Sequence, residues 1–141
     1  MLDVMPLEKA LGQLETSLGY LRSEMGRGDA GLYGQFRAAA IQGFEFTYEL
    51  ATRFIRRQLE QIAPSPALLR ELSFPDLMRA AAEAGLIPDA SAFRTYRERR
   101  NMTSHAYEEE KAEEALRGID DFVRDVRFLV EQLRTRNHAR D

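Results

Sequence analysis

The 141-residue chain has no cysteine and no tryptophan, only two histidines, and no long uninterrupted hydrophobic run. Without cysteine it has no disulfide scaffold, no thiolate zinc site and no thiol nucleophile. Two histidines are too few for a histidine-rich metal cage, and we expect neither a metal nor a cofactor. The short apolar runs and the lack of a basic-then-apolar N-terminus predict a cytoplasmic protein with no membrane segment.

The charge of the chain is nearly balanced, with 20 basic and 23 acidic residues and a net charge of −3. This balance argues against a protein that coats nucleic acid non-specifically, because such a protein needs a broad basic surface. The hydrophobic share of 44% and the charged share of 30% are typical of a globular chain of one domain. We therefore expect a single domain over residues 1–141, with its core at about 7–136 and a frayed tail at 137–141.

Apolar residues recur with helical spacing along most of the chain, and no segment alternates with the two-residue period of a β-strand. The first series runs from Leu7 to Met25, with Pro6 well placed at the helix start, and the glycine-rich segment 26–34 is predicted to be a turn. Further helices are predicted over residues 32–61, 73–84, 88–100 and 109–136, and Ser73 and Asp76 are spaced like a capping box at the start of the helix over 73–84. The expected fold is all-α, an up-and-down bundle of about five helices, two or three long and two short.

Two short patterns resemble functional motifs but have ordinary structural interpretations. Residues Gly26–Gly31 fit G-x-G-x-x-G, but that motif binds a dinucleotide only after a β-strand, so we interpret the segment as a turn. Glu45 and Glu49 lie one helical turn apart, but no histidine or second acidic pair accompanies them in a di-metal pattern. We interpret them as part of a solvated or interface stripe, with Glu49 paired to Arg53.

The segment Tyr96–Tyr107 is the strongest candidate for a functional site. Arg100 lies seven residues after Phe93 and four after Tyr96, so it shares their apolar face. A guanidinium directed inward needs an anion or hydrogen-bond acceptors, because a buried unpaired charge is very costly. The polar residues that follow it are Asn101, Thr103, Ser104, His105 and Tyr107.

This mixture of side chains suits phosphate, because the guanidinium fork binds the anion and an imidazole moves protons near neutral pH. The structural alternative is that Arg100 caps carbonyls or pairs with Glu98 or with an acidic residue of another helix. In that alternative His105 is an ordinary loop residue. The spacing alone favours neither interpretation over the other.

Two separated segments resemble a known family. Arg100–Tyr107 resembles the Arg-x4-6-His-x-Tyr motif of the HEPN superfamily, including the polar residue directly after the arginine. Ile41–Ala51 resembles the central-helix signature of one branch, the nucleotidyltransferase substrate-binding proteins, and Ala84–Ile87 also fits the pattern of that branch. The resemblance spans roughly Leu7 to Leu133.

The resemblance implies a helical bundle that dimerises, with the Arg/His segments of two chains lining a shared cleft. It also implies a partner, a minimal nucleotidyltransferase, with which the chain would form a toxin–antitoxin pair as a homodimer or a heterotetramer. In HEPN toxins the motif is a metal-independent ribonuclease site. His105 would then be the general acid or base, Arg100 would stabilise phosphoryl charge, and Asn101 would orient a phosphoryl oxygen. Tyr107 would accept AMP from the partner, and Thr103 and Ser104 would be supporting polar residues.

Two other functions remain open from the sequence. The chain can be a non-catalytic subunit that binds a nucleotide or another acceptor group and presents it to the nucleotidyltransferase, with an affinity that depends on Arg100. It can also be a structural helical adaptor in which Arg100 only closes a contact of the fold. RNA and nucleotides are therefore the expected ligands, and the sequence alone does not establish that the chain is an enzyme.

Overall fold

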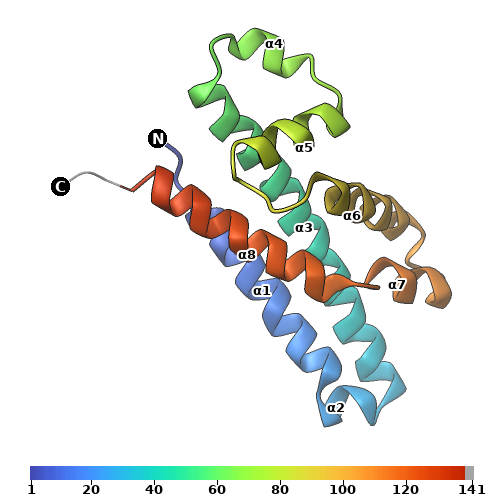
Figure 1. The fold of residues 1–141 in the computed structure, drawn as a ribbon. Helices are drawn as coiled ribbons and strands as arrows, with labels where there is room; N and C mark the ends of the chain where they lie inside the picture. Colours follow the sequence, from blue (N-terminus) through green and yellow to red (C-terminus); the bar gives the residue numbers. More distant parts are fainter. Residues whose placement is uncertain (139–141) are drawn as a thin grey trace.

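The computed structural model describes residues 1–138, and every regular element within them is a helix. The elements are α1 (Met5–Arg22), α2 (Glu24–Arg27), α3 (Ala30–Ile62), α4 (Pro66–Arg70), α5 (Phe74–Glu83), α6 (Ala90–Met102), the 3-10 helix η1 (Thr103–His105), α7 (Glu109–Ala115) and α8 (Ile119–Arg136). The predicted all-α fold class is confirmed (Figure 1). Within residues 1–138, no helix has both the length and the apolar character needed to cross a bilayer.

Helices α1, α3 and α8 form the long body of the bundle (Figure 1). Helices α1 and α3 pack closely at Gly43, where an added Cβ would lie 3.2 Å from the Cα of Leu14. Helix α8 runs antiparallel to α1, as shown by ion pairs that recur every seven residues, in opposite directions along the two helices. These pairs are Arg22–Asp120, Glu15–Arg127 and Glu8–Arg134. Exposed pairs of this kind each contribute little stability, so the body depends mainly on its apolar core.

Aromatic side chains hold α6 against this body. Phe44 of α3 and Phe122 of α8 pack edge to face, with ring centroids 4.8 Å apart. Tyr96 of α6 packs in the same manner on Phe122 at 5.1 Å and on Phe93 at 5.0 Å. The Tyr96 hydroxyl also donates a hydrogen bond to the carboxylate of Asp125 on α8, which is 2% exposed. These contacts fix the rotation of α6 and therefore the direction of the side chains at its C-terminal end.

The glycine-rich segment is shorter than the sequence predicted. Helix α1 ends before Met25 because Ser23 is extended and its side chain caps the short helix α2. Asp29 caps α3 by accepting the Leu32 N–H at 3.0 Å, and α3 therefore includes Gly34. The prediction of a turn through Gly34 is wrong, because a good N-cap and tertiary packing offset the weak helix propensity of glycine. The G-x-G-x-x-G segment follows a helix and not a β-strand, but its interpretation as a turn is wrong for most of its length, since only Gly28 and Asp29 lie between α2 and α3.

The predicted last helix, residues 109–136, is divided into two helices by residues 116–118. Gly118 has φ +73, a left-handed conformation that glycine adopts without the steric cost of a side chain. The break places α7 against α3, where Tyr33 and Arg37 donate hydrogen bonds to Glu113 at 2.8 and 2.9 Å. Burial alone would raise the pKa of Glu113, but the hydrogen bonds from Arg37 and Tyr33 outweigh it and lower the pKa.

Helices α4 and α5 lie at the opposite end of the body, beside the C-terminal end of α3 (Figure 1). Ser73 caps α5, as its sequence position predicted. The prediction of a frayed tail is wrong at Asn137, which is buried and joins two parts of the chain. Its side-chain oxygen accepts the Leu2 N–H at 3.0 Å, and its amide nitrogen donates to Gln58 at 2.7 Å. Residues 139–141 of the predicted tail lie outside the described residues.

Candidate functional site

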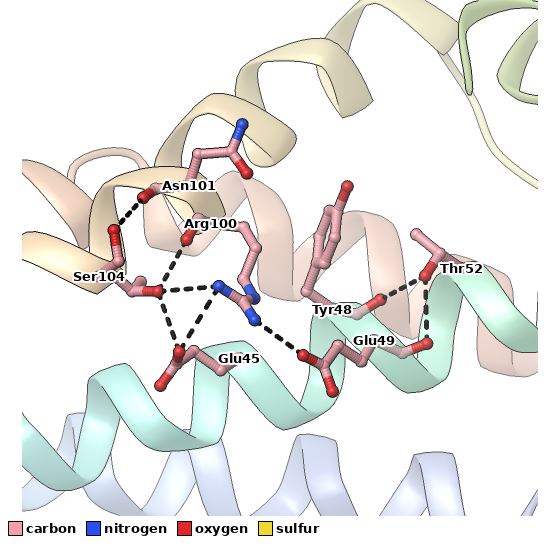
Figure 2. A network of polar contacts seen from close by, with 8 residues as sticks. Glu45, Tyr48, Glu49, Thr52, Arg100, Asn101 and Ser104 are labelled. Carbon is pink, nitrogen blue, oxygen red and sulfur yellow. Dashed lines mark hydrogen bonds and ion pairs between the residues drawn. The ribbon is translucent and has the colours of Figure 1, made fainter. Parts of the chain in front are cut away.

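The guanidinium of Arg100 lies between the C-terminal end of α6 and the middle of α3 (Figure 2). Its Nη2 atom is 2.8 Å from Glu49 Oε1, and its Nη1 atom is 3.6 Å from Glu45 Oε2. The expectation that this arginine points inward and needs an accepting partner is confirmed. The partner is an acidic pair on another helix, which was one of the structural alternatives.

The predicted pairing of Glu49 with Arg53 is wrong, since Glu49 contacts Arg100 and no ion pair joins it to Arg53 in the described part of the chain. Arg53 is exposed on α3, so holding its long side chain in one geometry would cost conformational entropy. The stem of Arg100 is already ordered by the packing of α6, and its side chain is only 28% exposed. Glu49 therefore pairs with Arg100 of α6 rather than with Arg53 of its own helix.

Thr103, the first residue of η1, links Arg100 to Glu45 through its hydroxyl group. Its hydroxyl oxygen lies 3.2 Å from Arg100 Nη1, 2.7 Å from the Arg100 carbonyl oxygen and 3.0 Å from Glu45 Oε2. Because the hydroxyl carries one proton, it accepts from the guanidinium and donates to one of the two oxygens at a time. Thr103 is 7% exposed, so it acts as a structural link that holds the turn after α6 against α3.

The other predicted site residues lie on the exposed side of the same junction. Asn101, Ser104 and His105 are exposed, and Tyr107 is 83% exposed. The Ser104 hydroxyl donates to the Asn101 carbonyl oxygen at 3.0 Å, and the Asn101 side chain points away from α3 in Figure 2. The rings of His105 and Tyr107 are neighbours, with centroids 6.5 Å apart. The motif is therefore divided between a half that faces α3 and a half that faces solvent.

Tyr48 is a further member of this neighbourhood, and the sequence analysis did not propose it as a site residue. It lies on α3 next to Glu49 and points toward α6 (Figure 2). Burial raises the pKa of Tyr48 to about 12, while the positive charges of Arg97 and Arg100 oppose this increase. The phenol therefore remains protonated at neutral pH. Its helical spacing from Glu45, on the same face of α3, was the available signal in the sequence.

The site combines an ion-paired guanidinium with exposed groups that can transfer a proton. The carboxylate side chain of Glu49 is 50% exposed, and ion pairs at such a surface are weak enough to exchange for another anion. The ring nitrogens of His105 have no hydrogen-bond partner among residues 1–138, so both are free to meet a ligand. In the same residues, no three His, Cys, Asp or Glu side chains are grouped to hold a metal ion.

The fold and this junction define an all-α protein with an ion-paired arginine and an exposed histidine at one helix junction. The family model described as nucleotidyltransferase substrate binding protein like matches residues 2–135. The chain belongs to this family. The resemblance to the nucleotidyltransferase substrate-binding branch of the HEPN superfamily is confirmed.

Two similar proteins from Haemophilus influenzae carry different functional names. One is named probable ribonuclease HepT and is 47% identical over 100 residues, which are 71% of this chain and 68% of that protein. The other is the solved structure of HI0074, which reveals the fold of a substrate binding domain of a nucleotidyltransferase. It is 36% identical with a TM-score of 0.87, and the match covers 94% of this chain and 99% of that one.

Proposed function

We propose that this chain is the HEPN subunit of a two-component nucleotidyltransferase system, and that the α6–η1 junction is a metal-independent endoribonuclease site. The observation that carries the proposal is that the Arg100 guanidinium and the exposed His105 ring lie five residues apart at one helix junction, where a bound phosphate would contact both. The similarity to a protein named probable ribonuclease HepT supports this choice.

The proposed reaction needs only the groups at the junction and the RNA itself. His105 takes the proton of a ribose 2′-hydroxyl, and the 2′ oxygen attacks the adjacent phosphorus. The bond from phosphorus to the 5′ oxygen breaks, and the leaving oxygen takes a proton from the imidazolium. The products are a 2′,3′-cyclic phosphate and a 5′-hydroxyl. Arg100 stabilises the charge on the phosphoryl oxygens and Asn101 orients one of them, while Thr103 and Ser104 hold the turn.

The exposed Tyr107 phenol is the proposed control point of this site. Its oxygen attacks the α-phosphorus of ATP held by a minimal nucleotidyltransferase, forms a new bond to AMP and releases pyrophosphate, and a base on that partner takes the phenol proton. The 83% exposure of Tyr107 leaves it accessible to a second protein. Because its ring lies beside the His105 ring, a bulky anion there would block the junction. The two proteins would then form a toxin–antitoxin pair.

The proposed active form is a homodimer in which the junctions of two copies line one cleft, alone or as a heterotetramer with the nucleotidyltransferase. A cleft built from two chains would place a second arginine and a second histidine near the same phosphate. Light scattering with size-exclusion chromatography of the chain, alone and with its partner, measures both assemblies. A monomer that cleaves RNA would overturn this part of the proposal.

The second candidate function is a non-catalytic subunit that binds a nucleotide for the nucleotidyltransferase. The name of the solved HI0074 structure, a substrate binding domain, and the ion-paired state of Arg100 favour this candidate. Calorimetry would then show nucleotide binding that is lost in Arg100→Gln, and no RNA would be turned over.

The test of the proposed function compares the wild-type chain with His105→Ala and His138→Ala on total RNA in EDTA. His138 is the other histidine of the chain, so its substitution controls for the removal of an imidazole. We expect wild-type and His138→Ala protein to cleave RNA and His105→Ala to leave it intact. Equal degradation by wild-type and His105→Ala protein would overturn the proposal. An absence of cleavage, with Tyr107 shown to be unmodified by intact mass, would favour the nucleotide-binding subunit.

A further inference from the structure

A cavity of about 380 Å³ opens between α5 and α6, in the helical turns of α6 that precede Arg100. Its lining includes three apolar and three cationic side chains, namely Phe74, Pro75, Met78, Arg79, Arg94 and Arg97. Phe74 and Met78 pack against the hydrophobic core, so the apolar side of the cavity is rigid. The proposed mechanism uses none of these residues.

Phe74 and Arg97 stack on each other beside the cavity. The guanidinium carbon of Arg97 lies 4.7 Å from the centroid of the Phe74 ring. An aromatic ring and an arginine in this arrangement bind nucleobases by stacking, because every base has a π-face and the guanidinium adds a cation–π contact. Fixed apolar side chains next to the ring exclude water from the base and strengthen this contact.

The cavity also carries positive charge without a matching negative charge. Arg79 is ion-paired with Asp76 at 2.8 Å, but Arg94 and Arg97 form no ion pair with a carboxylate among residues 1–138. Two arginines without a counterion, in a chain of net charge −3, give this cavity a local positive charge that attracts anions. The charges of Arg97 and Arg100 both act on the Tyr48 phenol, so the cavity and the Arg100 site share one positive field.

We propose that this cavity is a nucleotide subsite, in which a base stacks on Phe74 and Arg97 and the adjoining phosphate binds Arg94. One possible ligand of this subsite is an RNA nucleotide next to the cleaved bond, and for this ligand the inference rests on the proposed function. The other possible ligand, of the same chemistry, is a free nucleotide. Arg94 lies six residues before Arg100, about 9 Å along the helix axis and about 120° around it, so a strand of RNA that occupied both sites would have to follow the surface of α6.

The test measures binding of a fluorescein-labelled single-stranded RNA hexamer by anisotropy, in the His105→Ala background so that the RNA is not consumed. Arg94→Gln and Phe74→Leu are each expected to weaken binding by about tenfold, since stacking and charged phosphate contacts are of this size. The matched control is Arg127→Gln, which removes the same charge from the α1–α8 face, where Arg127 pairs with Glu15. We expect that control to change the affinity less than about twofold. Arg94 is exposed, so its variant keeps the fold even if Phe74→Leu perturbs α5.

The outcomes separate this subsite from the proposed ribonuclease. If His105-dependent cleavage is observed but Arg94→Gln binds the hexamer as tightly as Arg127→Gln, the subsite is overturned and the ribonuclease stands. If no RNA is cleaved but calorimetry shows AMP binding that Arg94→Gln weakens, the subsite stands as a free-nucleotide pocket. If neither the hexamer nor AMP binds, or both bind all variants equally, the subsite is overturned.

Discussion

Arg100 and Glu49 form an ion pair between α6 and α3, with Arg100 Nη2 lying 2.8 Å from Glu49 Oε1. The cation that the proposed reaction needs is therefore occupied by a carboxylate in the isolated chain. Glu49 and an incoming phosphate compete for the same guanidinium, and the negative charge of Glu49 also repels that phosphate. In the proposed function, the strength of this pair would limit how tightly the junction binds RNA.

Substituting Glu49→Gln is expected to increase the affinity for RNA by about two- to tenfold, because the amide keeps the size of the side chain but removes its charge. The unfolding free energy should fall by no more than about 1 kcal/mol, as is usual for a half-exposed pair. Anisotropy with labelled RNA in the His105→Ala background and urea unfolding measure the two quantities. The control Glu60→Gln removes another α3 carboxylate, which pairs with Arg70. An unchanged or weaker RNA affinity in Glu49→Gln would contradict the competition.

Tyr107→Phe is expected to abolish the transfer of AMP without changing stability, because the phenol is 83% exposed and supports no contact of the core. The measurement is intact mass after incubation with ATP and the nucleotidyltransferase. Tyr20→Phe, at a tyrosine that is 52% exposed, should still gain the mass of one AMP. Modification of Tyr107→Phe to the wild-type extent would show that another residue is the acceptor.

Tyr96→Phe is expected to lower the unfolding free energy by about 1–3 kcal/mol, since it leaves a buried acceptor without its donor. Asp125 is 2% exposed, and among residues 1–138 only Arg124 Nε, at 3.3 Å, remains as a hydrogen-bond donor to it. Urea unfolding measures the effect, with Tyr107→Phe as the surface control. A variant as stable as that control would show that the hydrogen bond between α6 and α8 is not needed to hold α6.

The free energy of unfolding should decrease at alkaline pH, because the buried tyrosines lose their protons more easily in the unfolded chain than in the folded one. Below pH 10 the Tyr48 phenol is protonated in both the folded and the unfolded chain, so its contribution is fully present. Between pH 10 and about 12 the unfolded chain loses the proton while burial keeps it on folded Tyr48, and the unfolding free energy falls by up to about 3 kcal/mol. Tyr96, whose pKa is also raised by burial and by its hydrogen bond to Asp125, adds to the loss.

Substituting Tyr48→Phe tests this pH dependence, because the variant has no proton to lose at that position. Urea unfolding at pH 8, 10 and 11 should show a smaller decrease for the variant than for the wild type. The two lysines and the other four tyrosines are common to both proteins, so the difference between the two sets of curves isolates Tyr48. Parallel curves for the two proteins would mean that the folded-state pKa of Tyr48 is not raised.

The sequence predicted the positions of the main helices because their apolar residues recur at helical spacing and their caps lie at the expected residues. The cap of α5 at Ser73 shows this most directly. It did not predict the break at Gly118, since one glycine within an apolar series leaves the periodicity unchanged. The sequence also predicted the start of α3 incorrectly. The glycines up to Gly34 indicated a turn, whereas the cap at Asp29 starts the helix at Ala30.

The candidate site was predictable only in part. The direction of Arg100 follows from its spacing on α6, but its partner Glu49 is 51 residues earlier in the chain. Which carboxylate meets it depends on how α6 packs on α3, and the pattern of one helix does not contain that information. The cavity beside Phe74 could not be predicted from the sequence for the same reason, because it forms only where α5 and α6 meet.

The most direct measurement is the chemistry of the RNA ends that the chain produces. A synthetic single-stranded RNA and an all-deoxy strand of the same sequence are incubated in EDTA with wild-type protein or with His105→Ala, and the fragments are analysed by mass spectrometry. We predict 2′,3′-cyclic phosphate and 5′-hydroxyl ends from wild-type protein on RNA alone, and no fragments from His105→Ala. Cleavage of the all-deoxy strand, equal cleavage by His105→Ala, or intact RNA with unmodified Tyr107 would contradict a ribonuclease site at the α6–η1 junction.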